Sequence, residues 1–263
     1  MLYRGAYPST SLARSMLALM LRMVCSRVAS ACSLPARRSN PAQSVNSSTG
    51  SRPNHPATPA ASPRRVIACS AATWKLAPIA AGHGDRRLAD FDVIFDSGRW
   101  DADFEATETD FLELIDDTAA EVPSVVDGLL NRGWARPDRV GICGRSLGGN
   151  VSYAALLADR RLRAAASIVG SPEWTLPRAH SPHHHPDRFF PAAVLSQSAE
   201  LDEYVPAGPV RDFHAALVPW YAEEPGRIEY VEYQGVGHFL TPELNEESCR
   251  RLVTWFERWL PGG

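Results

Sequence analysis

A serine in the segment Gly144-Arg145-Ser146-Leu147-Gly148 constrains the fold of this chain more than any other feature. The apolar residues 140–143 before it predict a buried strand, and residues 150–157 after it predict a helix. A strand that turns sharply into a helix holds the turn serine in a strained conformation, with its hydroxyl exposed. Small residues at 144 and 148 would let strand and helix approach closely. Ser146 is therefore a candidate nucleophile, although such a pentapeptide also arises by chance.

Two further loops supply the partners that a serine nucleophile needs. The predicted strand at residues 191–197 is followed by Asp202, and the predicted strand at residues 227–233 is followed by His238 on a glycine-rich loop. A serine hydroxyl is a weak nucleophile near neutral pH, so an imidazole must accept its proton and a carboxylate must orient that imidazole. The carboxyl ends of parallel strands meet at one edge of a sheet. The order Ser146, Asp202, His238 therefore predicts that three side chains converge there.

Two other acids compete with Asp202 for the orienting role. Glu200 and Glu203 stand on the same loop, and a Val-Pro pair follows Asp202 by three and four positions, which favours Asp202. The alternative interpretation of Asp202 is a turn or helix-cap residue, and that of His238 is a loop histidine satisfied by backbone groups.

Four short segments of the chain have the sequence pattern of a known enzyme family: residues 82–86, 139–149, 202–206 and 235–239. With them, residues 75–260 resemble α/β-hydrolases of the dienelactone-hydrolase and prolyl-oligopeptidase-like serine esterase type. The resemblance implies hydrolysis of a small-molecule ester, less often an amide, by Ser146, His238 and Asp202 without metal or organic cofactor. It also implies that the backbone N–H of Leu147 stabilises the oxyanion. Dienelactone hydrolases carry Cys where this chain has Ser146, which favours a general esterase.

The N-terminal part of the chain differs in composition from the rest. Residues 1–84 contain nine Arg and one Lys but no acidic residue, whereas the remainder holds 17 basic and 30 acidic residues. Residues 1–64 are rich in Ser, Ala, Pro and Arg, a composition that cannot bury a core. We expect a disordered basic arm over residues 1–64 and a hydrolase domain over residues 65–263.

The role of this arm is open between several interpretations. An acid-free segment rich in Arg and Ser is typical of an organelle transit peptide, and an upstream or shifted reading of a GC-rich gene gives a similar composition. A secretory signal or a membrane span is disfavoured because the apolar stretch at residues 16–21 is too short. Without interleaved aromatics we expect no nucleic-acid partner. Five cysteines without CxxC spacing favour a reducing compartment, hence the cytoplasm, or an organelle if the arm is a transit peptide.

The start of the expected domain leaves the oxyanion site incomplete. In the family that the chain resembles, a His-Gly loop after the third strand donates a second backbone N–H. Here His83-Gly84 looks instead like the loop after the following strand, predicted at residues 75–80. Residues 65–70 could only form a hairpin with that strand or continue it, because four residues cannot make a parallel crossover. The second donor stays unassigned, and a catalytically impaired hydrolase-fold protein, acting as a binding scaffold or existing as a truncated product, is the alternative.

The remaining pattern alternates helices and strands, which predicts an α/β class with a mainly parallel sheet. Helices are expected at residues 109–132, 210–221 and 243–260, and a further strand at residues 163–169. In the last helix we expect five buried side chains: Leu252, Val253, Trp255, Phe256 and Trp259.

Three further groups of residues have a structural and a functional interpretation. Trp174 and Phe189, in an insertion at the sheet edge, could line an acyl pocket or anchor a surface loop. The run His183-His184-His185 invites a metal site, but consecutive side chains do not converge as ligands do. Cys143 precedes Ser146 by three positions and is interpreted as a small core residue.

Overall fold

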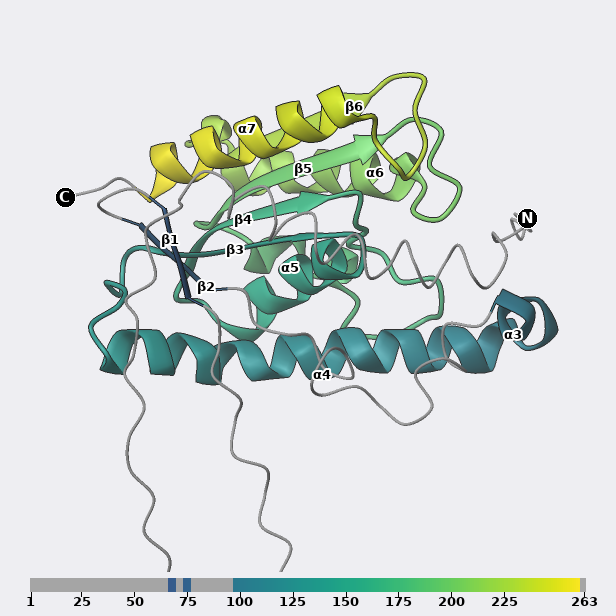
Figure 1. Ribbon diagram of the computed structural model, residues 1–263, viewed down its shortest axis with the longest axis horizontal. Helices are drawn as coiled ribbons and strands as arrows, with labels where there is room; N and C mark the ends of the chain where they lie inside the picture. The colour runs from purple at the N-terminus through teal and green to yellow at the C-terminus, as the bar shows by residue number, and fades with distance from the viewer. Residues whose placement is uncertain (1–65, 70–72, 77–96, 261–263) are drawn as a thin grey trace, which may run out of the picture. The chain divides into compact units, whose positions relative to one another are not determined.

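The computed structural model describes residues 66–69, 73–76 and 97–260 (Figure 1). The first two ranges form strands β1 (Val66–Cys69) and β2 (Thr73–Leu76), which pair antiparallel with Val66 opposite Leu76. Of the two arrangements that the short connection allows, a hairpin or a continued strand, this is the hairpin, in a compact unit separate from that of residues 97–260. The predicted arm over residues 1–64, the domain boundary after it and His83-Gly84 lie outside the described residues.

Residues 97–260 build a four-stranded parallel sheet with strand order β3-β4-β5-β6. The strands are β3 (Val140–Arg145), β4 (Leu162–Ile168), β5 (Ala193–Ala199) and β6 (Ile228–Tyr233). The register aligns their carboxyl ends, with Arg145 opposite Ile168 and Ala199 opposite Tyr233. The predicted α/β class with a parallel sheet is confirmed.

Helices cover both faces of this sheet (Figure 1). The helices are α3 (Ser97–Ala102), α4 (Phe104–Asn131), α5 (Leu147–Ala158), α6 (Ala207–Leu217) and α7 (Pro242–Trp259). Ala165 and Val194 face a core shared with α5 and α6, whereas Ala166 and Leu195 pack against Trp255 of α7. Because both faces are buried, small and apolar residues predominate in the central strands β4 and β5, without a regular polar alternation. No helix within residues 97–260 combines the length and apolarity needed to cross a bilayer.

The long helix α4 starts earlier than its apolar pattern predicts. The Asp103 side chain accepts a hydrogen bond from the Ala106 N–H at 3.2 Å and caps the helix five residues before the expected start. Leu112 and Ile115 are buried against α5, as the helical spacing predicts. Pro123 is accommodated inside the helix.

Two predicted core residues are exposed. Val253 of α7 is 42% exposed, because it lies two positions from the buried Trp255 and so points to the opposite side of the helix. Leu252, Phe256 and Trp259 are partly buried against the sheet. Cys143 is exposed as well. It lies on β3, an edge strand of the described four-stranded sheet, where Gly141 on the same face is exposed too.

Candidate active site

Ser146 is the single residue between the end of β3 and the start of α5. Its φ of 53° and ψ of −119° lie in a strained region for a non-glycine residue, as the sequence context predicts. Its backbone N–H donates to the carbonyl oxygen of Ile168 at 2.9 Å, which fixes the turn to the end of the neighbouring strand. The turn therefore projects the serine at the carboxyl edge of the sheet.

The glycines around Ser146 have unequal roles. A Cβ atom on Gly144 would lie 2.0 Å from the carbonyl oxygen of Gly148, so strand and helix can meet only if residue 144 lacks a side chain. A Cβ on Gly148 would meet none of the described atoms within 4 Å, so the predicted steric role of this residue is wrong. Gly149 takes it instead, because its Cβ would lie 2.9 Å from the Cα of Gly170 after β4.

The structure brings Ser146, His238 and Asp202 into one hydrogen-bonded row. Ser146 Oγ lies 3.0 Å from His238 Nε2, and His238 Nδ1 lies 2.8 Å from Asp202 Oδ2. In the tautomer whose Nδ1–H donates to the carboxylate, Nε2 accepts from the serine hydroxyl. The Asp202 side chain is fully buried and that of His238 is 5% exposed. The site therefore holds a nucleophile, a base and an orienting acid at reaction distances.

Asp202 has more hydrogen bonds than the one to His238. Its Oδ1 accepts from the backbone N–H groups of Tyr204 and Val205, at 2.9 and 2.8 Å. Both carboxylate oxygens are thus engaged, which fixes the side chain and stabilises its negative charge. Of the rival acids, Glu203 is exposed, and Glu200 accepts from the backbone N–H of Gly235 at 2.8 Å.

Arg145 is a residue whose contribution the sequence did not predict. Its guanidinium donates to the backbone carbonyl of His238 at 3.2 Å and to Asn245 Oδ1 at 2.5 Å. The Asn245 amide in turn donates to the carbonyl of Leu240 at 2.9 Å. Burial lowers the pKa of Arg145, and the negative charge of Asp202 opposes this shift. Arg145 therefore connects the serine turn with the histidine loop and α7.

One of the two expected oxyanion donors lies next to the serine. Leu147 is the first residue of α5, so its N–H has no partner inside the helix. The second donor stays unassigned within the described part of the chain.

The structure buries both residues that were predicted as a possible acyl pocket, Trp174 and Phe189. Phe189 is 1% exposed and packs on Phe213, with ring centroids 4.9 Å apart. It shares its core cluster with Val140 and Leu162, which begin β3 and β4, at the opposite end of the sheet from Ser146. Trp174 is 5% exposed and buried against α4 and α5. Phe189 therefore anchors the insertion in the core. Trp174 is buried in a cluster against which Leu147 also packs, so a place beside the acyl group stays a prediction for Trp174.

The insertion that contains Trp174 is fastened to α4 by charged groups. Asp116 of α4 accepts from Arg178 at 3.4 Å and lies 3.0 Å from His180 Nε2. Burial raises the pKa of Glu108 on the same helix to about 7, although a hydrogen bond from Thr175 and the charge of Arg178 oppose the shift. These contacts hold the insertion in place on the same side of the sheet as α4.

Two of the three consecutive histidines have separate hydrogen-bond partners. His183 Nδ1 lies 2.8 Å from Ser181 Oγ, and His185 Nε2 donates to the carbonyl of Ala179 at 2.8 Å. The His183 and His184 rings lie 3.8 Å apart, and burial together with the His184 charge lowers the pKa of His183. The described residues contain no group of three or more ligating side chains placed to hold a metal ion.

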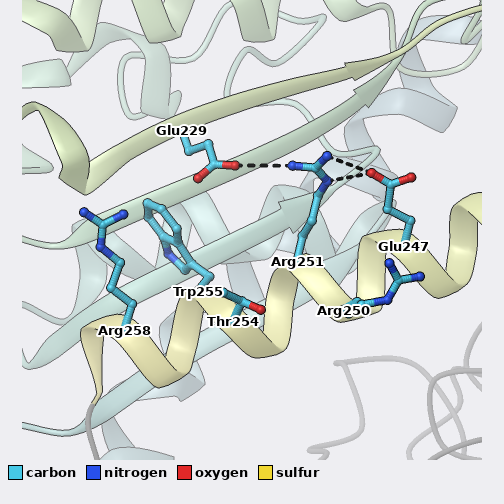
Figure 2. Close-up of a pocket in the computed structure, with 7 residues that line it drawn as sticks. All are labelled: Glu229, Glu247, Arg250, Arg251, Thr254, Trp255 and Arg258. Atoms are coloured by element: carbon cyan, nitrogen blue, oxygen red, sulfur yellow. Dashed lines mark hydrogen bonds and ion pairs between the residues drawn. The ribbon is translucent and has the colours of Figure 1, made fainter.

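A hollow of about 270 Å³ lies between α7 and the start of β6 (Figure 2). Arg251 spans it, at 2.7 Å from Glu247 and 3.6 Å from Glu229. Arg250, Thr254, Trp255 and Arg258 complete the lining. The hollow begins near the amino end of β6 and is separate from the three residues at the carboxyl ends.

The parallel sheet with flanking helices and the serine turn between β3 and α5 define the α/β-hydrolase fold class. Within it, residues 113–182 match the model of the prolyl oligopeptidase family. The segment contains the serine turn and supports the resemblance to prolyl-oligopeptidase-like hydrolases found in the sequence.

Several known proteins are similar to part of this chain. The Bacillus subtilis protein YitV, provisionally named an esterase, is 22% identical over 163 residues, which are 51% of this chain and 60% of YitV. The chain thus spans less than two thirds of that relative. The structure of TT1662 from Thermus thermophilus aligns with 58% of this chain and 66% of the TT1662 chain, with 20% identity and a TM-score of 0.49. A protein from Klebsiella pneumoniae assigned as a dienelactone hydrolase covers 54% of this chain and 61% of its own length, with 19% identity and a TM-score of 0.46.

Proposed function

We propose that this protein is a serine hydrolase that cleaves a small ester through an acyl-enzyme on Ser146. The observation that carries the proposal is the row from Ser146 Oγ through His238 to Asp202, with separations of 3.0 and 2.8 Å. Three loops distant in sequence contribute these groups, and a buried carboxylate behind an imidazole has the form that activates a serine. The match to the prolyl oligopeptidase family over residues 113–182 supports the same class of reaction.

The proposed reaction proceeds in two acyl transfers. Ser146 Oγ attacks the carbonyl carbon while its proton passes to His238 Nε2, and the resulting oxyanion accepts a hydrogen bond from the Leu147 N–H. The intermediate collapses, the bond to the alcohol oxygen breaks, and Nε2 returns the proton to that oxygen. Water then attacks the acyl-enzyme with the same histidine as base, which releases the acid and restores Ser146.

An ester is the proposed substrate in preference to an amide. Removing one oxyanion donor costs on the order of 10²- to 10³-fold in rate, and only Leu147 is assigned as a donor within the described residues. An alkoxide is a better leaving group than an amide anion, and an ester carbonyl carbon is more electrophilic than that of an amide, so an ester tolerates weaker stabilisation of the intermediate. The name of YitV also refers to ester hydrolysis.

Labelling by a fluorophosphonate, together with hydrolysis of p-nitrophenyl acetate, tests the proposal. We expect the full-length protein to become labelled at Ser146 and to hydrolyse the ester, and Ser146→Ala to abolish both. Asp202→Asn should lower kcat by about 10³- to 10⁴-fold, because an amide favours the wrong imidazole tautomer. Ser171→Ala, which changes a serine after β4 outside the hydrogen-bonded row, is the control and should retain both properties. A folded protein that is neither labelled nor active would refute the proposal.

A further inference from the structure

The proposed reaction fixes the side on which the leaving alcohol must lie. His238 Nε2 takes the serine proton and then gives it to the alcohol oxygen, so that oxygen has to come within hydrogen-bond distance of Nε2. The remainder of the alcohol consequently extends over side chains that adjoin the imidazole. Residues around His238 therefore select the alcohol part of the ester, and the acyl part lies toward Leu147.

Two aromatic side chains adjoin the His238 ring. The ring centroids of Tyr204 and Phe239 each lie 5.3 Å from that of His238, and 6.0 Å from one another. Phe239 is 43% exposed, and Leu201, which precedes Asp202, is 58% exposed. Phe239 thus exposes an aromatic ring beside the proton-transferring group, and the Leu201 backbone N–H donates to Val236 on the histidine loop, which places an exposed apolar residue next to this loop.

The charge around these rings favours a neutral partner. Burial raises the pKa of Tyr204, and the negative charges of Glu203 and Asp202 raise it further, so its phenol stays protonated at neutral pH. The same carboxylates would repel an anionic group placed over the ring. An uncharged aromatic alcohol meets no such repulsion and fits the edge-to-face geometry of the two rings.

We propose that Tyr204, Phe239 and Leu201 form a leaving-group subsite, and that the substrates are esters of aromatic or bulky apolar alcohols. This inference rests on the proposed function and deepens it by naming the alcohol. Tyr204 and Phe239 contact the ring of the alcohol, and Leu201 extends the apolar surface outward.

Three esters that differ by one phenyl ring test the subsite: methyl acetate, benzyl acetate and methyl phenylacetate. The last two are isomers, with the ring on the alcohol side and on the acyl side, respectively. Each is measured as kcat/KM with the full-length protein and with Phe239→Ala, Tyr204→Ala and Trp220→Ala. The ratio of two esters in one protein cancels any general displacement of His238, so the ratio reports contacts with the ring. Trp220 is the matched control, an aromatic residue 50% exposed and located after the end of α6.

We expect Phe239→Ala and Tyr204→Ala each to lower the benzyl acetate to methyl acetate ratio about tenfold. The methyl phenylacetate to methyl acetate ratio should stay unchanged, and Phe239→Leu should recover part of the loss. Trp220→Ala should alter neither ratio. A protein that hydrolyses all three esters with ratios unaffected by Phe239→Ala, or altered only on the acyl side, would overturn the subsite and leave the proposed function intact. A protein inert toward all three would overturn both.

Discussion

Replacing Gly144 with alanine should separate the strand from the helix at the serine turn. The added Cβ would lie 2.0 Å from the carbonyl oxygen and 2.1 Å from the carbonyl carbon of Gly148. Non-bonded carbon contacts are favourable only near about 3.5 Å, so the two backbones would have to move apart by more than about 1 Å. Both atoms met by the Cβ belong to the backbone, so no side-chain rotation can relieve the contact.

The expected losses in stability and in activity follow from this displacement. Overpacking in a core costs about 1–3 kcal/mol, and a clash with backbone belongs at the upper end, about 3 kcal/mol of unfolding free energy. Ser146 lies between the two displaced segments, and its Oγ is 3.0 Å from His238 Nε2. Because a misplacement of about 1 Å costs on the order of 10²-fold in rate, we expect a loss of this size in kcat.

Urea unfolding and ester hydrolysis measure the two effects, and Gly148→Ala provides the matched control. A Cβ at residue 148 meets no described atom within 4 Å, so this variant should stay close to the wild type in both assays. Equal stability and activity of the two variants would refute the argument from close approach. A large loss for Gly148→Ala alone would reverse the assignment of the two glycines.

Two further predictions concern groups behind the serine. Arg145→Met removes the hydrogen bonds to the His238 carbonyl and to Asn245, so His238 should shift slightly. We expect kcat to fall by about tenfold to a hundredfold, the order of the cost of a small displacement, with little change in KM. An unchanged kcat would contradict the positioning role. Burial lowers the pKa of His214 to about 4 from the ordinary 6.5, and its Nε2 lies 2.6 Å from Ser196 Oγ. Between these pH values the unfolded chain binds the extra proton, so this contribution to stability is complete above about pH 6.5 and is lost as the pH falls toward 4. From pH 7 to pH 5 urea unfolding should show the wild type losing about 2 kcal/mol more than His214→Gln, and equal losses would contradict the prediction.

The sequence was sufficient to predict the sheet and the residues that its edge brings together. Strand, turn and helix around Ser146 follow from local patterns, as do the loops that end β5 and β6. The convergence needs only one additional fact, which is that parallel strands align their carboxyl ends. Asp202 and His238 therefore could be selected without coordinates, although their catalytic roles await the labelling experiment.

The errors have a common physical origin. The sequence left Phe189 open between a pocket and an anchor and predicted Val253 as buried, because residue type does not show the end of the sheet or the side of the helix on which a residue lies. Cys143 lies in β3, which the strand order places at an edge of the described sheet, and the apolar pattern of a strand does not show whether it is an edge strand. Arg145 stands at a position that the serine motif leaves open, and its partner Asn245 is 100 residues away. Such long-range polar contacts leave no periodic signal in one sequence.

Hydrogen bonds join the loop that bears Asp202 to the loop that bears His238. The backbone N–H groups of Glu200 and Leu201 donate to the carbonyls of Tyr233 and Val236, each at 2.9 Å. The Glu200 carboxylate accepts from the Gly235 N–H, so both loops are linked by main chain and side chain. Arg145, the last residue of β3, then links these two loops to the strand that precedes Ser146. The separations among nucleophile, base and acid are consequently set by hydrogen bonds of the protein itself, and the relay is assembled before any substrate arrives.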